Sequence, residues 1–162
     1  MKALILYRSY FGNTKALAEA MARGISDLGN QCVVQDLRQR LPKLEEFDCA
    51  IIGSPTRMAR PGRRALKALR RLRKAGFTGR PVALFDTYGP LPGTPEELEK
   101  ARKWITPGAA GIMEQSARGL GLDVHGQAQR FAVSGLKGPL AEGSLEKAAA
   151  FARGLAQSVK PR

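Results

Sequence analysis

The chain contains few of the residues that most often build metal sites and disulfide frameworks. It has two cysteines and one histidine in 162 residues. Cys32 and Cys49 lack Cys-x-x-Cys spacing, which argues against a metal site or a disulfide framework. Both lie in apolar, strand-like runs, so we expect buried, unreactive thiols. His125 has no second histidine near it, so neither metal ligation nor histidine-based catalysis is expected.

Long apolar runs are also missing. No run approaches the roughly 20 residues that a membrane-spanning helix needs. The N-terminus carries one lysine and five apolar residues before Arg8, which is too short for the core of a signal peptide. We therefore expect a cytoplasmic protein with no transmembrane segment, whose first residues form a strand.

Acidic residues are scarce. The chain has 14 Asp and Glu against 27 Lys and Arg, a formal net charge of +13. The excess is local, because ten basic residues and no acid lie between Arg57 and Arg80. A solvated helix face is the default interpretation of such a run. The alternative is a surface for an anionic partner: an acidic redox protein, a small anionic substrate, a membrane or nucleic acid. Nucleic acid is the weakest of these, because the run has no interleaved aromatics and no known reader motif.

The length predicts a single domain over residues 1–162. Apolar, strand-like runs alternate with amphipathic helical patterns along it. This order is typical of an α/β fold, a three-layer doubly wound domain built on a parallel sheet of five strands. The predicted strands are Lys2–Tyr7, Cys32–Gln35, Cys49–Gly53, Pro81–Thr87 and a weaker one near Arg130–Ser134.

The loop after the first predicted strand has the composition of a phosphate site. It reads Ser9-Tyr10-Phe11-Gly12-Asn13-Thr14 and is followed at once by a helical pattern. The free N–H groups and the dipole of a helix N-terminus favour an anion. Gly12 allows close backbone approach or a positive φ, and Ser9, Asn13 and Thr14 offer side-chain hydrogen bonds. The simpler alternative is an ordinary capped helix start.

Two further loops should meet the first one. Gly53–Met58 follows the third predicted strand, and Asp86–Gly89 follows the fourth. In a doubly wound sheet, ligands bind beyond the carboxyl ends of the strands. These loops therefore predict a pocket with a phosphate end and two flanking walls.

These three motifs resemble those of the flavodoxin family. The first loop is similar to the family's phosphate loop. The segment Ile51–Thr56 is similar to the family's apolar strand that ends in Gly-Ser/Thr-Pro-Thr. The segment Phe85–Gly89 is similar to the family's strand that ends near an aromatic residue and a glycine. The resemblance implies the strand order 2-1-3-4-5 and an FMN site. Its phosphate would lie on Ser9–Thr14 and its ring between the two other loops, with Tyr88 stacking on the ring or, alternatively, being a partly buried loop tyrosine. The implied contacts are Ser9, Tyr10, Phe11, Gly12, Asn13, Thr14, Ser54, Pro55, Thr56, Arg57, Met58, Thr87, Tyr88 and Gly89.

The sequence departs from the family pattern in three places. Phe11 stands where many members have a hydroxyl residue, and Arg57 and Met58 stand where many have a stacking aromatic. The third departure is an inserted segment at about 90–106, with Thr94 as the N-cap of its own helix. Trp104 on this helix either covers the flavin as part of a lid or docks a surface helix onto the body.

The resemblance implies an FMN-binding electron carrier that passes electrons between redox partners. Acidic partner surfaces would face the Arg57–Arg80 segment. No catalytic acid, base or nucleophile is evident, and Asp86 at a strand end is better interpreted as a loop cap. Two alternatives stay open: a flavin-dependent oxidoreductase acting on a quinone or porphyrinogen, and a non-redox anion-binding module on the same fold.

Overall fold

A computed structural model describes residues 1–90 and 92–160. Residue 91 of the predicted insertion and the last two residues of the predicted domain lie outside the described residues. The central sheet is parallel, with the strand order β2-β1-β3-β4-β5. The predicted doubly wound α/β fold and its strand order 2-1-3-4-5 are thereby confirmed. The first four strands are β1 Lys2–Tyr7, β2 Gln31–Asp36, β3 Cys49–Pro55 and β4 Pro81–Tyr88.

The fifth position of the sheet is shared by two short strands rather than one. β5 (Asp123–Val124) pairs with the start of β4, and β6 (Gln129–Ala132) pairs with its end. The chain turns between them at Gly126, whose φ of +62° favours glycine. The sheet therefore has six strands, and the predicted strand near 130–134 corresponds to β6. A two-residue strand is too short to produce a recognisable hydrophobic pattern.

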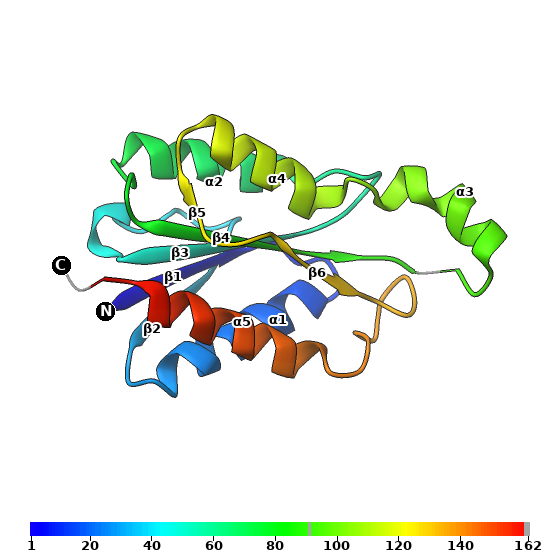
Figure 1. Cartoon of the computed structure of the whole chain (residues 1–162), viewed down its shortest axis with the longest axis horizontal. Helices are drawn as coiled ribbons and strands as arrows, with labels where there is room; N and C mark the ends of the chain where they lie inside the picture. Colours follow the sequence, from blue (N-terminus) through cyan, green and yellow to red (C-terminus); the bar gives the residue numbers. More distant parts are fainter. Residues whose placement is uncertain (91, 161–162) are drawn as a thin grey trace.

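Helices cover both faces of the sheet (Figure 1). Because side chains alternate along a strand, Leu4 and Leu6 pack in the core beneath α2 and α4, whereas Ile5 packs with α1 and α5. The loop between β2 and β3 contains a short 3-10 helix, Leu44–Glu46. The covering helices are α1 Asn13–Ser26, α2 Arg63–Lys74, α4 Gly108–Gly119 and α5 Ser144–Ser158.

One helix stands apart from these layers. α3 (Pro95–Ile105) lies beyond the end of the sheet, away from the N-terminus (Figure 1). The hydroxyl of Thr94 caps it by accepting a hydrogen bond from the Glu97 amide at 3.2 Å. None of its residues is buried. Within the described ranges, no helix of the chain has both the length and the apolar character that crossing a membrane requires.

Candidate functional site

The three predicted loops line one pocket at the carboxyl ends of β1, β3 and β4. Its enclosed part measures about 180 Å³, less than the roughly 300 Å³ at the low end for ligand pockets. A larger ligand would therefore be only partly enclosed. The lining residues are Ser9, Tyr10, Phe11, Asn13, Thr14, Pro55, Thr56, Arg57, Thr87, Tyr88, Gly89, Val133 and Leu136.

Three residues implied by the resemblance do not line this pocket. Gly12 forms the turn before α1, with a φ of +95°, and its amide donates to Ser9 Oγ at 3.0 Å. Ser54 is fully buried, and its hydroxyl accepts from the Gly62 amide at 3.0 Å. Met58 is 73% exposed on the outer turn of its loop. Gly12 and Ser54 therefore shape the loops.

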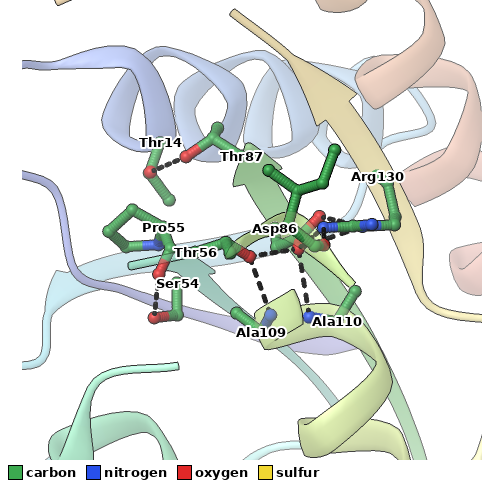
Figure 2. A network of polar contacts seen from close by, with 10 residues as sticks. Thr14, Ser54, Pro55, Thr56, Asp86, Thr87, Ala109, Ala110 and Arg130 are labelled. Carbon is green, nitrogen blue, oxygen red and sulfur yellow. Dashed lines mark hydrogen bonds and ion pairs between the residues drawn. The ribbon is translucent and has the colours of Figure 1, made fainter. Parts of the chain in front are cut away.

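The phosphate-like end of the pocket is the N-terminus of α1. The first intrahelical bond runs from the Ala16 amide to the Gly12 carbonyl at 2.9 Å, so the preceding amides have no partner within the helix. Buried Thr14 and Thr87 join their hydroxyls at 3.0 Å (Figure 2). This bond fixes the first loop to the end of β4. The arrangement can accept an anion through backbone N–H groups.

The mouth of the pocket is aromatic and cationic. The guanidinium groups of Arg8 and Arg57 lie 4.2 and 4.4 Å from the centre of the Tyr10 ring. Lys137 lies 5.9 Å from the centre of the Phe11 ring. Each cation is attracted to the face of its ring. Positive charge therefore gathers around the loop that would hold an anion.

The loop after β3 turns sharply beside the pocket. Met58 and Ala59 both have positive φ, at 50° and 62°, which is uncommon for residues with side chains. The Ala59 amide donates to the Trp104 carbonyl at 2.7 Å. The end of α3 therefore supports this turn through its backbone. The Trp104 side chain is 49% exposed and is not among the lining residues.

Asp86 is the centre of a buried polar network (Figure 2). Its carboxylate is fully buried and accepts hydrogen bonds from Thr56 Oγ1 at 2.6 Å and from the Ala110 amide at 3.2 Å. Arg130 Nη2 forms an ion pair with it at 2.9 Å. The Thr56 hydroxyl also accepts from the Ala109 amide at 2.7 Å. Asp86 thus caps the start of α4, which agrees with the interpretation of this residue as a loop cap.

Arg130 connects this network to the pocket and to α3. The same guanidinium donates to the Ile105 carbonyl at 2.7 Å and lies 4.2 Å from the centre of the Tyr88 ring. Tyr88 itself lines the pocket. One side chain of β6 therefore positions the aromatic wall, the strand end and the last turn of α3. Across the described ranges, every fully buried side-chain nitrogen or oxygen has a partner, and no cluster of three potential metal ligands occurs.

The sequence analysis missed Arg130 and the two apolar lining residues Val133 and Leu136. All three belong to β6 or to the loop that follows it. This loop, Ser134-Gly135-Leu136-Lys137-Gly138-Pro139, is rich in turn residues and follows a predicted parallel strand. The same rule that brought the other three loops together therefore applied to it as well.

Comparison with known proteins was made for both sequence and structure. The family model described as "Flavodoxin domain" matches residues 4–106. A flavodoxin from the domain Archaea superposes with a TM-score of 0.77 at 23% identity, covering 99% of this chain and 100% of that one. Oxidised Flavodoxin 1 from Bacillus cereus gives a TM-score of 0.74 at 18% identity, covering 99% and 100%.

Part of a longer chain also matches. The flavodiiron protein from Giardia intestinalis gives a TM-score of 0.74 at 19% identity over 96% of this chain, but only 35% of that chain is covered. No curated protein matches the sequence significantly. At these identities the superpositions establish the fold, whereas the family match extends over more than half of the sequence. The chain therefore belongs to the flavodoxin family.

Proposed function

We propose that this protein binds FMN in the pocket formed by its three loops and carries electrons between cytoplasmic redox partners. The observation that carries the proposal is the convergence of Ser9–Thr14, Pro55–Arg57 and Thr87–Gly89 on one pocket at the carboxyl ends of the strands. Two of these loops are linked by the Thr14–Thr87 hydroxyl pair. The residues present fit the groups of FMN at both ends of the pocket.

The phosphate fits the first loop. The amides of the first turn of α1, which have no partner within the helix, present N–H groups to an anion, and the turn at Gly12 leads into this helix. Arg8 and Arg57, held against Tyr10, add positive charge nearby. A dianion there needs no buried lysine, because several donors and two guanidinium groups already share its charge.

The isoalloxazine ring fits between the second and third loops. Tyr88 offers an aromatic face suited to stacking, and Arg130 holds the Tyr88 ring from β6. Pro55, Thr56 and Arg57 form the opposite wall. Met58 does not line the pocket, so of the two residues that depart from the family pattern in this loop, Arg57 is the one that would contact the ring.

The cofactor, when bound, supplies the one- and two-electron chemistry, and the protein supplies binding and electrostatics. Because the pocket of about 180 Å³ is too small to enclose all of FMN, part of the bound cofactor would stay accessible to a partner. The ten basic residues from Arg57 to Arg80 would favour partners with acidic surfaces. The association rate with such a partner should fall steeply as salt is added.

Titration of the purified protein with FMN and with riboflavin tests the proposal. We expect saturable quenching of FMN fluorescence and a flavin absorbance spectrum perturbed by stacking. Riboflavin should bind at least tenfold more weakly, because it lacks the phosphate that the first loop would hold. No saturable uptake of FMN would overturn the proposal and favour a non-redox anion-binding module.

A second candidate is an oxidoreductase that uses the same cofactor on a small molecule such as a quinone or porphyrinogen. The aromatic and cationic mouth around Tyr10 favours it, because a planar anion could stack there beside two guanidinium groups. The flavodiiron match shows that this fold also occurs within larger proteins of another class. Rapid turnover of a quinone with reduced nicotinamide, without any added protein, would favour the enzyme over the carrier.

A further inference from the structure

A second charged surface lies away from the flavin pocket. Between α2 and the loop that joins β2 to β3 runs an open groove of about 850 Å³, continued by a smaller one that shares three of its cations. We name the two together the basic groove. None of its lining residues lines the pocket described above. Its cations are Arg40, Lys43, Arg64, Lys67, Arg71 and Lys74.

Packing of α2 against the sheet produces one wall of this groove. Ala65, Ala68, Leu69 and Leu72 are buried in the core beneath the helix. The basic residues between them must therefore face outward, and all seven basic side chains of α2 are exposed. Only some of the seven face the groove, and Arg63, Arg70 and Arg73 lie outside it.

The six cations have few acidic neighbours, although the pKa of the Glu46 carboxyl group, lowered mainly by a hydrogen bond from Lys2, is lowered further by the nearby Lys43. Within the part of the chain that the structure describes, none of them forms an ion pair, and the one acid in the lining is Glu45. Six like charges along one groove repel one another and create a strong positive potential. An occupant with several anionic groups would relieve this repulsion.

The floor of the groove limits what that occupant can be. The apolar lining residues that make up this floor are Leu41, Pro42, Leu44 and Ala75 along the larger part and Leu37, Leu41 and Ala68 along the smaller one. No aromatic side chain lines it, so it has no platform for stacking bases. A segment that alternates acidic and apolar side chains could pair its acids with the cations of the walls and pack its apolar side chains on the floor.

We propose that the basic groove binds an acidic segment of a partner protein whose apolar side chains contact the floor. α2 is 12 residues long, or about 18 Å, which matches about five or six residues of extended chain. This inference rests on the acidic partners proposed above and deepens that proposal, because it assigns their recognition to one groove whose lining residues do not line the flavin pocket. The bound segment would tether its protein to this chain.

Two variants of equal net charge distinguish the effect of the cations in the groove from the effect of the overall charge of α2. R64E/K67E/R71E reverses three cations inside the groove, and R63E/R70E/R73E reverses three outside it on the same helix. Arginine, lysine and glutamate have similar helix propensities, so both variants should fold alike. The probe is a fluorescein-labelled synthetic hexapeptide, Leu-Glu-Leu-Glu-Leu-Glu, whose acidic and apolar side chains alternate along an extended chain; binding is measured by fluorescence anisotropy with increasing NaCl.

We expect the wild type to bind the peptide with an affinity that falls as NaCl rises. The affinity for the peptide should fall at least tenfold in the groove variant R64E/K67E/R71E and less than threefold in the control variant R63E/R70E/R73E. Equal losses in the two variants, or no binding to the wild type, would overturn the proposal. So would competition by oligo-dT or anionic vesicles at lower concentration than by the peptide. FMN titration and circular dichroism of each variant keep this outcome distinct from failure of the flavin site or of folding.

Discussion

Arg130 Nη2 lies 2.9 Å from the fully buried carboxylate of Asp86, although the two residues are 44 positions apart in the chain. The pair joins β6 to β4 at the edge of the pocket. The same arginine holds the Tyr88 ring and the end of α3. A single ion pair thus links the aromatic wall of the proposed flavin site to the structural core.

Replacing Arg130 with Met should strongly destabilise the protein. Removing one partner leaves an uncompensated buried charge, which costs about 3–5 kcal/mol. Urea unfolding measures this loss. The double variant D86N/R130M should be more stable than the sum of the two single changes predicts, because no charge is left unpaired. Strict additivity would show that the ion pair contributes nothing of its own.

Replacing Gly12 with Ala should weaken FMN binding roughly tenfold, because a side chain at a φ of +95° strains the turn before α1 by about 1–2 kcal/mol. Riboflavin affinity should change less than twofold. Gly29 is the matched control, since it also has a positive φ, at 78°, with open space around it, but lies beyond the other end of α1. G29A should leave FMN affinity unchanged. Equal losses for FMN and riboflavin in G12A would remove the assignment of this loop to the phosphate.

Replacing Tyr88 with Leu should lower FMN affinity about three- to tenfold, because an aromatic pair contributes about 0.5–1.5 kcal/mol beyond its buried area. The fluorescence of bound FMN should also rise as stacking is lost. Titration of each protein with FMN, followed by fluorescence, measures both the affinity and the fluorescence of the bound cofactor.

Replacing Trp104 with Leu is the matched comparison. Its ring is half exposed and does not line the pocket, and its carbonyl, which holds Ala59, is unaffected by the change. FMN affinity should therefore stay within twofold of the wild type. A large loss would instead support the hypothesis that this helix closes over the ring.

The two cysteines should make stability fall at high pH. Burial raises the pKa of the Cys32 thiol from 9.0 to about 12, and burial together with the neighbouring Cys32 raises the pKa of Cys49 to about 12. Because the folded state holds these protons more tightly, their stabilisation is complete below pH 9 and is lost as the pH rises toward 12. Each thiol should contribute a slope of about 1.4 kcal/mol per pH unit in that window. The difference in unfolding free energy between the wild type and the C32A/C49A variant isolates this slope, and parallel curves would contradict it.

The strands that the sequence predicted well are those buried on both sides. Continuous apolar runs such as Lys2–Tyr7 and Pro81–Thr87 arise because helices cover both faces of the sheet. The sequence could not predict that two short strands share the fifth position of the sheet. β5 has only two residues, and its pairing depends on β4 rather than on a local pattern. The strand order came from the family resemblance, since the residues alone do not specify which strands are neighbours.

The lining of the pocket could also be predicted in part. The rule that loops meet at the carboxyl ends of strands brought together most of the lining residues. It could not show that two consecutive residues with positive φ turn Met58 outward. Nor could it pair Asp86 with Arg130, because their contact depends on the register between β4 and β6, two strands far apart in the sequence, and on side-chain reach.

The attachment of α3 has a consequence for how this protein could diversify. The helix is held through the backbone carbonyls of Trp104 and Ile105, and it buries none of its own side chains. Carbonyl groups are the same in every amino acid, so mutations along the outer turns would leave the attachment intact. The exposed residues of α3 could therefore be substituted, in evolution or by design, to bind different partners while the loops of the pocket stay the same.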